Sequence, residues 1–255
     1  MEFVPPNHPR RESLLIRERL VEGFREGYVA PQGLIAQGRG ECFDYLIGEV
    51  TTEEAWEAER AAVAAMLLAR RPVISVNGNV AALAPEGVVK LAEAVGAALE
   101  VNLFYRTRER EVLIAEVLRR HGAREVLGVG DDASCTIPEL FSERRRVSCR
   151  GIYVADVVFV PLEDGDRTEA LRKMGKVVIA VDLNPLSRTA RAASITIVDN
   201  VVRAVPNMVK LAEEMRGWPR EKLEALLKSY DNGAVLRRAL RRIAERLYDM
   251  AEGRA

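Results

Sequence analysis

Polar side chains follow several short apolar runs of this 255-residue sequence, and their types suit the binding of a small anionic or hydroxylated molecule. Asn77 and Asn79 flank a glycine after one run, Asp182 and Asn184 follow another, and Asp199-Asn200 follows the last. If these runs are parallel strands, their carboxyl ends meet at one edge of a sheet, where loops converge and helix N-termini offer unsatisfied N–H groups. The sequence therefore predicts that its chemistry takes place at that edge.

The stretch Asp182-Leu183-Asn184-Pro185-Leu186-Ser187-Arg188-Thr189 is the richest of these strand exits. A carboxylate and an amide can hydrogen-bond a ribose or a base, while Arg188 and the N-terminus of a short helix capped by Ser187 suit phosphate oxygens. The same residues also make an ordinary turn followed by an ordinary N-cap. A nucleotide cradle and a structural turn both stay open here, and Asp199-Asn200 carries the same two interpretations.

Other strand exits offer groups for a second ligand. Asn77-Gly78-Asn79 can hold a hydroxy acid or a carbonyl without adding charge, or can form a simple glycine turn. Arg106 suits a phosphate or a carboxylate. Asp131 and Asp132 can hold magnesium or the amine of a substrate, or can cap a helix.

One motif points to a different function. Gly128-Val129-Gly130-Asp131-Asp132-Ala133 matches the G-x-G-x-x-A fingerprint of a dinucleotide site, which predicts a dehydrogenase. The match follows the third apolar run rather than the first, and its two adjacent carboxylates would repel a pyrophosphate. These features weigh against the dinucleotide interpretation.

Isolated arginines and histidines are less informative. Arg17 and Arg39 stand in helical and glycine-flanked contexts where arginines are usually surface charges. The cluster Arg144-Arg145-Arg146, with Arg150, predicts a solvated loop, because no aromatic or further basic stripe accompanies it. His8 and His121 are too few and too far apart to predict a metal site or a histidine-based triad, so no metal ligand is assigned from the sequence.

Several familiar catalytic and structural motifs are missing from the sequence. It contains neither the P-loop pattern G-x-x-x-x-G-K-[ST] nor G-x-S-x-G. Cys42, Cys135 and Cys149 are odd in number and lack CxxC spacing, which argues against a disulfide framework and against structural zinc. We therefore expect three buried or bystander thiols.

The charge balance excludes some partners. The 38 basic and 38 acidic residues cancel, so no overall field recruits nucleic acid or an anionic membrane. Basic residues are nearly all arginine and aromatics make up only 5%, a composition that favours a heat-adapted protein. The stretch from Met1 to Arg11 lacks the apolar core of a signal peptide, and no later run reaches membrane-spanning length. These patterns predict a cytoplasmic protein.

The elements that must position these residues form an α/β pattern. Residues 1–70 predict an N-terminal helical segment, and residues 71–255 predict a Rossmann-like, doubly wound α/β domain with C-terminal helices, the two possibly forming one compact unit. A helix with a capping box at Thr51 and Glu54 closes the first segment. Six continuous apolar runs, typical of strands buried on both faces of a mainly parallel sheet, are Val73–Val76, Leu99–Leu103, Glu125–Val129, Asp156–Val160, Val177–Asp182 and Ser194–Asp199. Three helices, at Pro206–Arg216, Pro219–Ser229 and Asn232–Met250, are expected after the sixth run.

A set of short motifs, none specific alone, resembles the archaeal phosphopantothenate synthetases (4-phosphopantoate-β-alanine ligases) in order and spacing. The resemblance extends from about His8 to the final helices. The motifs that carry it are His8-Pro9-Arg10, Gly38-Arg39-Gly40-Glu41, Ser75 to Asn79, Asn102-Leu103-Phe104-Tyr105-Arg106, Pro161 to Thr168, Asp182 to Thr189 and Asp199-Asn200.

This resemblance implies a homodimeric enzyme that joins 4-phosphopantoate to β-alanine while ATP becomes AMP and pyrophosphate, as a step of coenzyme A biosynthesis. From their residue types we expect Asn77, Asn79 and Arg106 to bind substrate, and Asp131 to receive the amine of β-alanine. The residues that it implies for ATP are Arg17, Arg39, Asp182, Leu183, Asn184, Arg188, Thr189, Asp199 and Asn200.

The implied reaction fits the residue types. A carboxylate reacts with an amine only after it carries a leaving group, and transfer to AMP supplies one without a protein nucleophile. The site must align the carboxylate with the α-phosphorus and stabilise charge on the phosphoryl oxygens, with Mg²⁺ assisting. Whether the intermediate is an acyl adenylate or an acyl phosphate stays open, and no catalytic residue is assigned.

Two other functions stay open at this point. One is an NAD(P)-dependent oxidoreductase that binds its cofactor at Gly128 to Ala133. The other is a nucleotide-sensing module without catalysis.

Overall fold

A parallel sheet forms the centre of the protein, which is seen here in a computed structural model that describes residues 4–162 and 164–254. Its five strands lie in the order β2-β1-β5-β6-β7, and every neighbouring pair is parallel. The predicted α/β, Rossmann-like class is confirmed. The strands are β1 (Pro72–Val76), β2 (Ala98–Val101), β5 (Val157–Pro161), β6 (Val177–Val181) and β7 (Ile195–Ile197).

The third predicted strand, Glu125–Val129, is reduced to a single bridge. Leu127 pairs with β2 through its N–H to Leu99 O at 2.8 Å and through its carbonyl, which accepts from Val101 N at 2.9 Å. Pairing stops there because Gly128 and Gly130 have φ values of 76° and 59°, outside the extended range of a strand. With Leu127 beside β2, the spatial order still follows the doubly wound pattern, in which the first strand is central and the order reverses between β1 and β5.

Successive side chains of each strand point to opposite faces of the sheet, which divides the core into two layers. In β5, Val157 and Phe159 face one cluster of buried residues, and Val158 and Val160 face another. Helices α3, α5, α6 and α9 supply the first cluster, while α7 and the segment around Ile152 supply the second. Both faces of the sheet are therefore covered, which explains why the strands are apolar without interruption.

Side-chain caps and prolines set many helix starts. Thr107 Oγ1 accepts from Arg110 N at 3.3 Å at the start of α6, and α5 begins with Pro85. The cap of α3 is Thr52 rather than Thr51, since Thr52 Oγ1 accepts from Ala55 N. The helices up to β7 are α1 (Arg11–Arg25), α2 (Pro31–Ile47), α3 (Glu53–Leu68), α4 (Gly78–Leu83), α5 (Pro85–Val95), α6 (Arg108–Arg120), α7 (Gly165–Lys173) and α8 (Arg188–Ala192).

The C-terminal helices match the prediction except at one start. Helix α9 (Val201–Met215) begins before Pro206, because the Asn200 side chain accepts from Val202 N and starts the helix earlier. Proline inside the helix removes one backbone donor without ending it. Helices α10 (Arg220–Ser229) and α11 (Asn232–Ala251) follow, and no helix among the described residues is long and apolar enough to cross a membrane.

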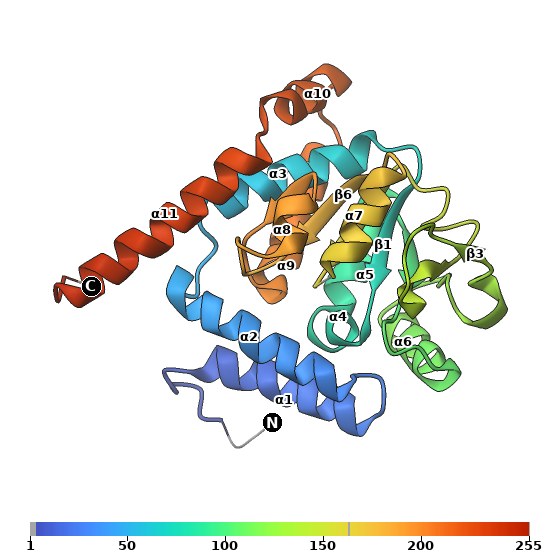
Figure 1. The fold of residues 1–255 in the computed structure, drawn as a ribbon, viewed down its shortest axis with the longest axis horizontal. Coiled ribbons are helices and arrows are strands. Elements are labelled where there is room, and N and C mark those ends of the chain that lie inside the picture. Colours follow the sequence, from blue (N-terminus) through green and yellow to red (C-terminus); the bar gives the residue numbers. More distant parts are fainter. Residues whose placement is uncertain (1–3, 163, 255) are drawn as a thin grey trace.

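Helices α1 and α2 lie apart from the helices that cover the sheet, whereas α3 belongs to that covering layer. Figure 1 shows α1 and α2 as a pair below α4, with α11 extending beyond the rest of the molecule. Helix α3 instead packs against α9, and ten of its residues are buried. The pair α1 and α2 is therefore the part of the N-terminal segment that reaches the edge where β1 and β6 end.

A disulfide contradicts the expectation of three free thiols. Cys135 and Cys149 are joined, while Cys42 is free and exposed rather than buried. Cys135 lies on β3 (Cys135–Thr136), which pairs antiparallel with β4 (Arg146–Val147), so this small hairpin brings the two cysteines together. The odd count was misleading because a third, unrelated cysteine lies elsewhere in the chain.

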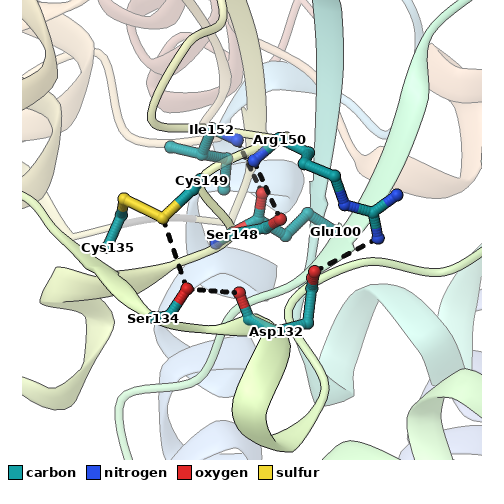
Figure 2. Close-up of a disulfide and its surroundings, with 8 residues drawn as sticks. All are labelled: Glu100, Asp132, Ser134, Cys135, Ser148, Cys149, Arg150 and Ile152. Atoms are coloured by element: carbon teal, nitrogen blue, oxygen red, sulfur yellow. Dashed lines mark hydrogen bonds and ion pairs between the residues drawn. A yellow bond between two sulfur atoms is a disulfide. The ribbon is translucent and has the colours of Figure 1, made fainter.

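The disulfide-bonded segment is also held to the sheet by a buried carboxylate (Figure 2). Glu100, on β2, accepts hydrogen bonds from Ser148 N at 2.9 Å and Ile152 N at 2.6 Å. Burial raises the pKa of this carboxyl to about 7, although the two backbone donors oppose the increase. Gly151 has to be glycine, because a Cβ there would lie 2.0 Å from Glu100 Oε2.

Candidate active site

A cavity of about 680 Å³ opens at the carboxyl edge of the sheet, where the sequence predicts the chemistry. Its wall combines α2, the loops after β1, β5 and β6, and the segment after β2. The reversal of strand order between β1 and β5 leaves this edge open, as in other doubly wound sheets. The predicted residues that line it are Arg39, Asn77, Asn79, Asp182, Leu183, Asn184, Thr189 and Asn200.

Asp182 holds the loop that follows β6 through hydrogen bonds. Its Oδ1 accepts from Asn184 N at 2.9 Å, and its Oδ2 accepts from the Ser187 hydroxyl. Ser187 Oγ in turn accepts from Ala190 N at 2.9 Å, as the predicted N-cap of α8. Burial raises the pKa of Asp182, while these hydrogen bonds and the charge of Arg39 oppose the increase.

The two asparagines after β1 have different partners. Asn77 caps α4 through its Oδ1, and its Nδ2 donates to Leu162 O at 3.0 Å, so it ties the exit of β1 to that of β5. Asn79 Nδ2 donates to Gly33 O of α2 at 2.9 Å. A Cβ on Gly33 would lie 2.2 Å from Asn79 Oδ1, so the close approach of α2 depends on this glycine.

Two arginines that the sequence did not predict as ligand-binding residues line the opposite end of the cavity, near the end of β2. Arg110, on α6, donates to the carbonyls of Tyr28 and Tyr105, and no ion pair of it with a described carboxylate is present. Burial, and then the charge of Arg144, lower the pKa of Arg110. Two cations facing one cavity favour an anion there.

Arg144 contradicts the prediction of a solvated loop. It is only 7% exposed, and its guanidinium donates to Asn102 O at 3.2 Å and pairs with Asp164 at 2.6 Å. Asn102 Nδ2 donates back to Arg144 O at 3.1 Å, so the loop is fixed to the end of β2. The signal in the sequence was the basic cluster itself, but nothing in it distinguishes the one buried member.

Arg106 and Asp131 do not line the cavity. Arg106 forms an ion pair with Glu111 at 2.5 Å in which the two side chains are 3% and 4% exposed. It also donates to Gly128 O at 2.9 Å and Arg146 O at 2.7 Å, which accounts for its buried charge. Asp131 is exposed in a short 3-10 helix, Gly130–Asp132.

Three of the residues implied for ATP also lie outside this cavity. Arg17 pairs with Glu41 at 2.6 Å, and Arg188 pairs with Glu169 at 3.0 Å, both with exposed guanidinium groups. Asp199 is fully buried behind Asn200. The structure thus brings most of the residues implied for ATP together in the cavity, and these three lie outside it.

The dinucleotide fingerprint has no suitable structure around it. Gly128 to Ala133 contains a three-residue 3-10 helix, Gly130–Asp132, and leads into β3 rather than into an α-helix whose N-terminus could hold a pyrophosphate. Gly130 N donates to Glu111 Oε2 at 2.7 Å and Gly128 N to Asp132 Oδ2 at 2.7 Å, so carboxylates already occupy its donors. The oxidoreductase interpretation loses its basis.

Fold and cavity together place the chain among Rossmann-like α/β proteins with a polar ligand cavity at the carboxyl edge. Residues 54–246 match the phosphopantothenate/pantothenate synthetase family. A protein of Methanosarcina mazei named 4-phosphopantoate-β-alanine ligase is 59% identical over 98% of each chain. Proteins with the same name from Thermococcus kodakarensis (99% of this chain, 96% of theirs) and Methanospirillum hungatei (98% and 100%) are 57% and 45% identical. The chain belongs to the phosphopantothenate/pantothenate synthetase family.

Proposed function

We propose that this protein is an ATP-dependent ligase that condenses 4-phosphopantoate with β-alanine to 4′-phosphopantothenate, with AMP and pyrophosphate as the other products, in coenzyme A biosynthesis. The observation that carries the proposal is that arginines from three separate elements, Arg39, Arg110 and Arg144, line one cavity. Two of the three reactants carry phosphate, and separated cations suit two phosphate-bearing molecules held together. The names of the relatives support the same reaction.

We place the nucleotide at the end of the cavity formed by α2 and the exits of β6 and β7. The carboxylate and amides there suit a ribose or base, and Arg39 suits phosphate oxygens. Arg17 and Arg188 belong to the proposed set if they exchange their present carboxylate partners for phosphate, in their own subunit or across a dimer contact. The proposed ATP residues are Arg17, Arg39, Asp182, Leu183, Asn184, Arg188, Thr189, Asp199 and Asn200.

The proposed place for 4-phosphopantoate is the opposite end of the cavity. Arg110 and Arg144 would hold its phosphate, and the amides of Asn77 and Asn79 lie on the wall between the two ends. This arrangement would direct the carboxylate of 4-phosphopantoate toward the α-phosphorus of ATP. Attack of the β-alanine amine on the activated carbonyl would then form the amide and release AMP, with the amine proton passing to solvent.

The cavity wall also fits Mg²⁺. Asp164 and Asp182 are the carboxylates among its described lining residues, and Mg²⁺ is commonly held by one or two carboxylates together with substrate phosphates. Both carboxylates already have protein partners, so phosphate oxygens and water would supply the other ligands. When bound, the ion would neutralise charge on the phosphates.

The test is a reaction with purified protein, ATP, Mg²⁺, 4-phosphopantoate and β-alanine. We expect pyrophosphate and AMP in equal amounts, and none of either product when 4-phosphopantoate is omitted. Formation of ADP would replace the acyl adenylate by an acyl phosphate. ATP binding without any turnover would favour the nucleotide-sensing module and would refute the ligase proposal.

We propose further that the enzyme is a homodimer and works in the cytoplasm. The resemblance supports the dimer, and exposed apolar residues near the end of α11 offer a surface for it, namely Leu247, Tyr248 and Met250. ATP as a substrate supports the cytoplasmic location.

A further inference from the structure

A buried cluster of charged side chains lies beside the nucleotide end of the cavity, where α2 meets the start of α9. Asp44 of α2 and Arg203 of α9 form an ion pair at 2.5 Å, with side chains only 7% and 18% exposed. Arg203 also pairs with Asp199 at 2.6 Å, and Asp199 Oδ2 accepts from the Thr51 hydroxyl at 2.6 Å. One guanidinium therefore joins a carboxylate from the N-terminal helices to a carboxylate at the end of β7.

The same cluster fixes the side chain of Asn200, which lines the cavity. Asn200 Nδ2 donates to Asp44 Oδ2 at 2.8 Å, and its Oδ1 accepts from Val202 N at 3.3 Å. Its backbone N–H donates to Asp199 Oδ1 at 2.7 Å. Because both ends of the amide and the backbone are held, Asn200 presents one orientation to the cavity.

Asp44 also fixes the rotation of α2 about its own axis. Gln37 and Gly40 precede Asp44 by seven and four residues, so the three share one face of the helix, and Gln37 and Gly40 both line the cavity. Arg39, the cation that α2 brings to the cavity, is adjacent to Gly40. Rotation of α2 about its axis would therefore displace Arg39 together with the part of the cavity wall that we propose binds the nucleotide.

The cluster is stable only as a unit. Burial opposes the charged form of Arg203, yet the hydrogen bond to Asp44 and the charge of Asp199 raise its pKa. Removing Arg203 leaves two carboxylates buried without a cation, and removing the charge of Asp44 takes away one ion-pair partner of Arg203 and weakens the acceptor of the Asn200 amide, so in both cases the remaining side chains must rearrange. Any such rearrangement reaches Asn200, which shares Asp44 and Asp199 with Arg203.

We propose that Asp44 and Arg203 are positioning residues for the nucleotide, acting through Asn200 and the placement of α2. The inference rests on the proposed function. It extends that function by assigning roles to two residues that do not line the cavity.

The experiment measures the KM of each substrate in Asp44→Asn and Arg203→Gln. We expect the KM for ATP to rise at least tenfold in both, and the KM values for 4-phosphopantoate and β-alanine to stay within about twofold. The split is expected because the described contacts of the cluster lead to Asn200, at the nucleotide end, whereas Arg110 and Arg144 line the other end of the cavity. A milder variant, Arg203→Lys, keeps the charge but cannot bridge both carboxylates in the bidentate manner of a guanidinium, so it should fold and still raise the KM for ATP.

The matched control is Arg242→Gln. It breaks the pair between Arg242 and Glu54, 2.9 Å apart, in which Glu54 is also largely buried and which also joins an N-terminal helix to a C-terminal one. We expect it to lower the melting temperature but to leave the KM for ATP unchanged. A melting curve of each variant separates loss of fold from loss of positioning.

A double-mutant cycle tests the route through Asn200. If Asp44 acts through this amide, Asp44→Asn should raise the KM for ATP much less in an Asn200→Ala background than in the wild type. Equal increases in all three KM values, or an unchanged KM for ATP in the folded variants, would overturn the proposal. If the wild type shows no ligase activity, ATP affinity measured by calorimetry tests the same positioning separately from the reaction.

Discussion

At the residue scale, the arginines of this protein are distinguished by what their guanidinium groups contact. Arg106 is bound to Glu111 and two carbonyls, Arg17 and Arg188 are bound to exposed carboxylates, and Arg110 is bound only to carbonyls. For Arg39 no ion pair with a described carboxylate is present, although burial raises the pKa of Asp182 and the charge of Arg39 opposes that increase. Arg39 is therefore the cation at the nucleotide end that can accept a phosphate without first giving up an ion-pair partner.

Replacing Arg39 tests this difference. Arg39→Gln removes a charge-assisted hydrogen bond to phosphate, so we expect the KM for ATP to rise by roughly tenfold or more. Arg237→Gln is a suitable control, because Arg237 is exposed on α11 with a distant partner at 3.9 Å, and it should leave the KM unchanged. Equal KM values in the two variants would exclude a role for Arg39 in holding the nucleotide.

Glu59 makes stability depend on pH. It is fully buried on α3, and burial, followed by the charge of Asp199, raises its pKa from 4.5 to about 8. Between these values the unfolded chain releases the proton and the folded chain keeps it, so rising pH favours unfolding. Below about pH 4.5 both states are protonated, and the effect disappears.

Glu59→Gln mimics the protonated form and should remove this dependence. Relative to the wild type, we expect the free energy of unfolding of the variant to be higher by roughly 3 kcal/mol at pH 7 and about equal at pH 4. Denaturant melts at the two pH values measure the difference. Glu93→Gln, at an exposed position of α5, serves as the control, and a pH-independent difference for Glu59→Gln would contradict the buried titration.

At the element scale, the connection from the Leu127 bridge to β5 contains a hairpin held by a disulfide in place of an α-helix. The bond spans a sequence separation of 14 residues, and the segment also carries Arg144 to the cavity. Glu100, Asn102 and Arg106 hold the same segment by hydrogen bonds to its backbone. The disulfide should therefore contribute more to stability than to the position of Arg144.

Replacing both cysteines should separate the two effects. We expect Cys135→Ser with Cys149→Ser to lower the free energy of unfolding by about 3 kcal/mol, the entropy cost of closing a loop of this length in the unfolded chain, while kcat changes little. Melting curves with and without reductant measure the effect. Cys42→Ser should melt like the wild type, and a wild-type melting temperature insensitive to reductant would show that the bond is absent in solution.

Sequence patterns predicted the elements better than the contacts between them. Continuous apolar runs identified the five strands, and parallel pairing then required that Asn77, Asp182 and Asn200 share one edge. The face of α2 that lines the cavity was not predictable, because it is built from Gly33, Gln37 and Gly40 and has no apolar stripe. Burial of Arg144 was hidden for a similar reason, since its compensating contacts come from residues distant in sequence.

At the scale of the whole molecule, ion pairs connect the beginning of the chain to its end. Glu54 pairs with Arg242, Glu57 pairs with Arg238, and Asp44 pairs with Arg203. Such networks agree with the arginine-rich composition that favours a heat-adapted protein. The proposed cytoplasmic location fits the disulfide in the same way, since intracellular proteins of hyperthermophiles are often rich in disulfides. The proposed division near residue 70 stays a prediction.

Oligomeric state is the prediction that belongs to this scale. We expect light scattering to give twice the 28.3 kDa mass of the chain. Charges introduced on the exposed apolar positions, Tyr248→Asp with Met250→Asp, should shift the protein toward monomer, because burying unpaired carboxylates in an interface is costly. A wild type that stays at the monomer mass over a wide concentration range would rule out the homodimer.

The contact between Asp44 and Arg203 spans 159 positions of sequence. During synthesis the ribosome must therefore release most of the chain before Asp44 of α2 finds this partner, and until then α2 lacks the ion pair that fixes its rotation. A nascent chain that stops before α9 would lack the nucleotide wall even if β1 to β6 had paired. Acquisition of ATP binding should consequently be one of the last events of biosynthesis, and ribosome-bound fragments of increasing length would reveal it as a late, abrupt step.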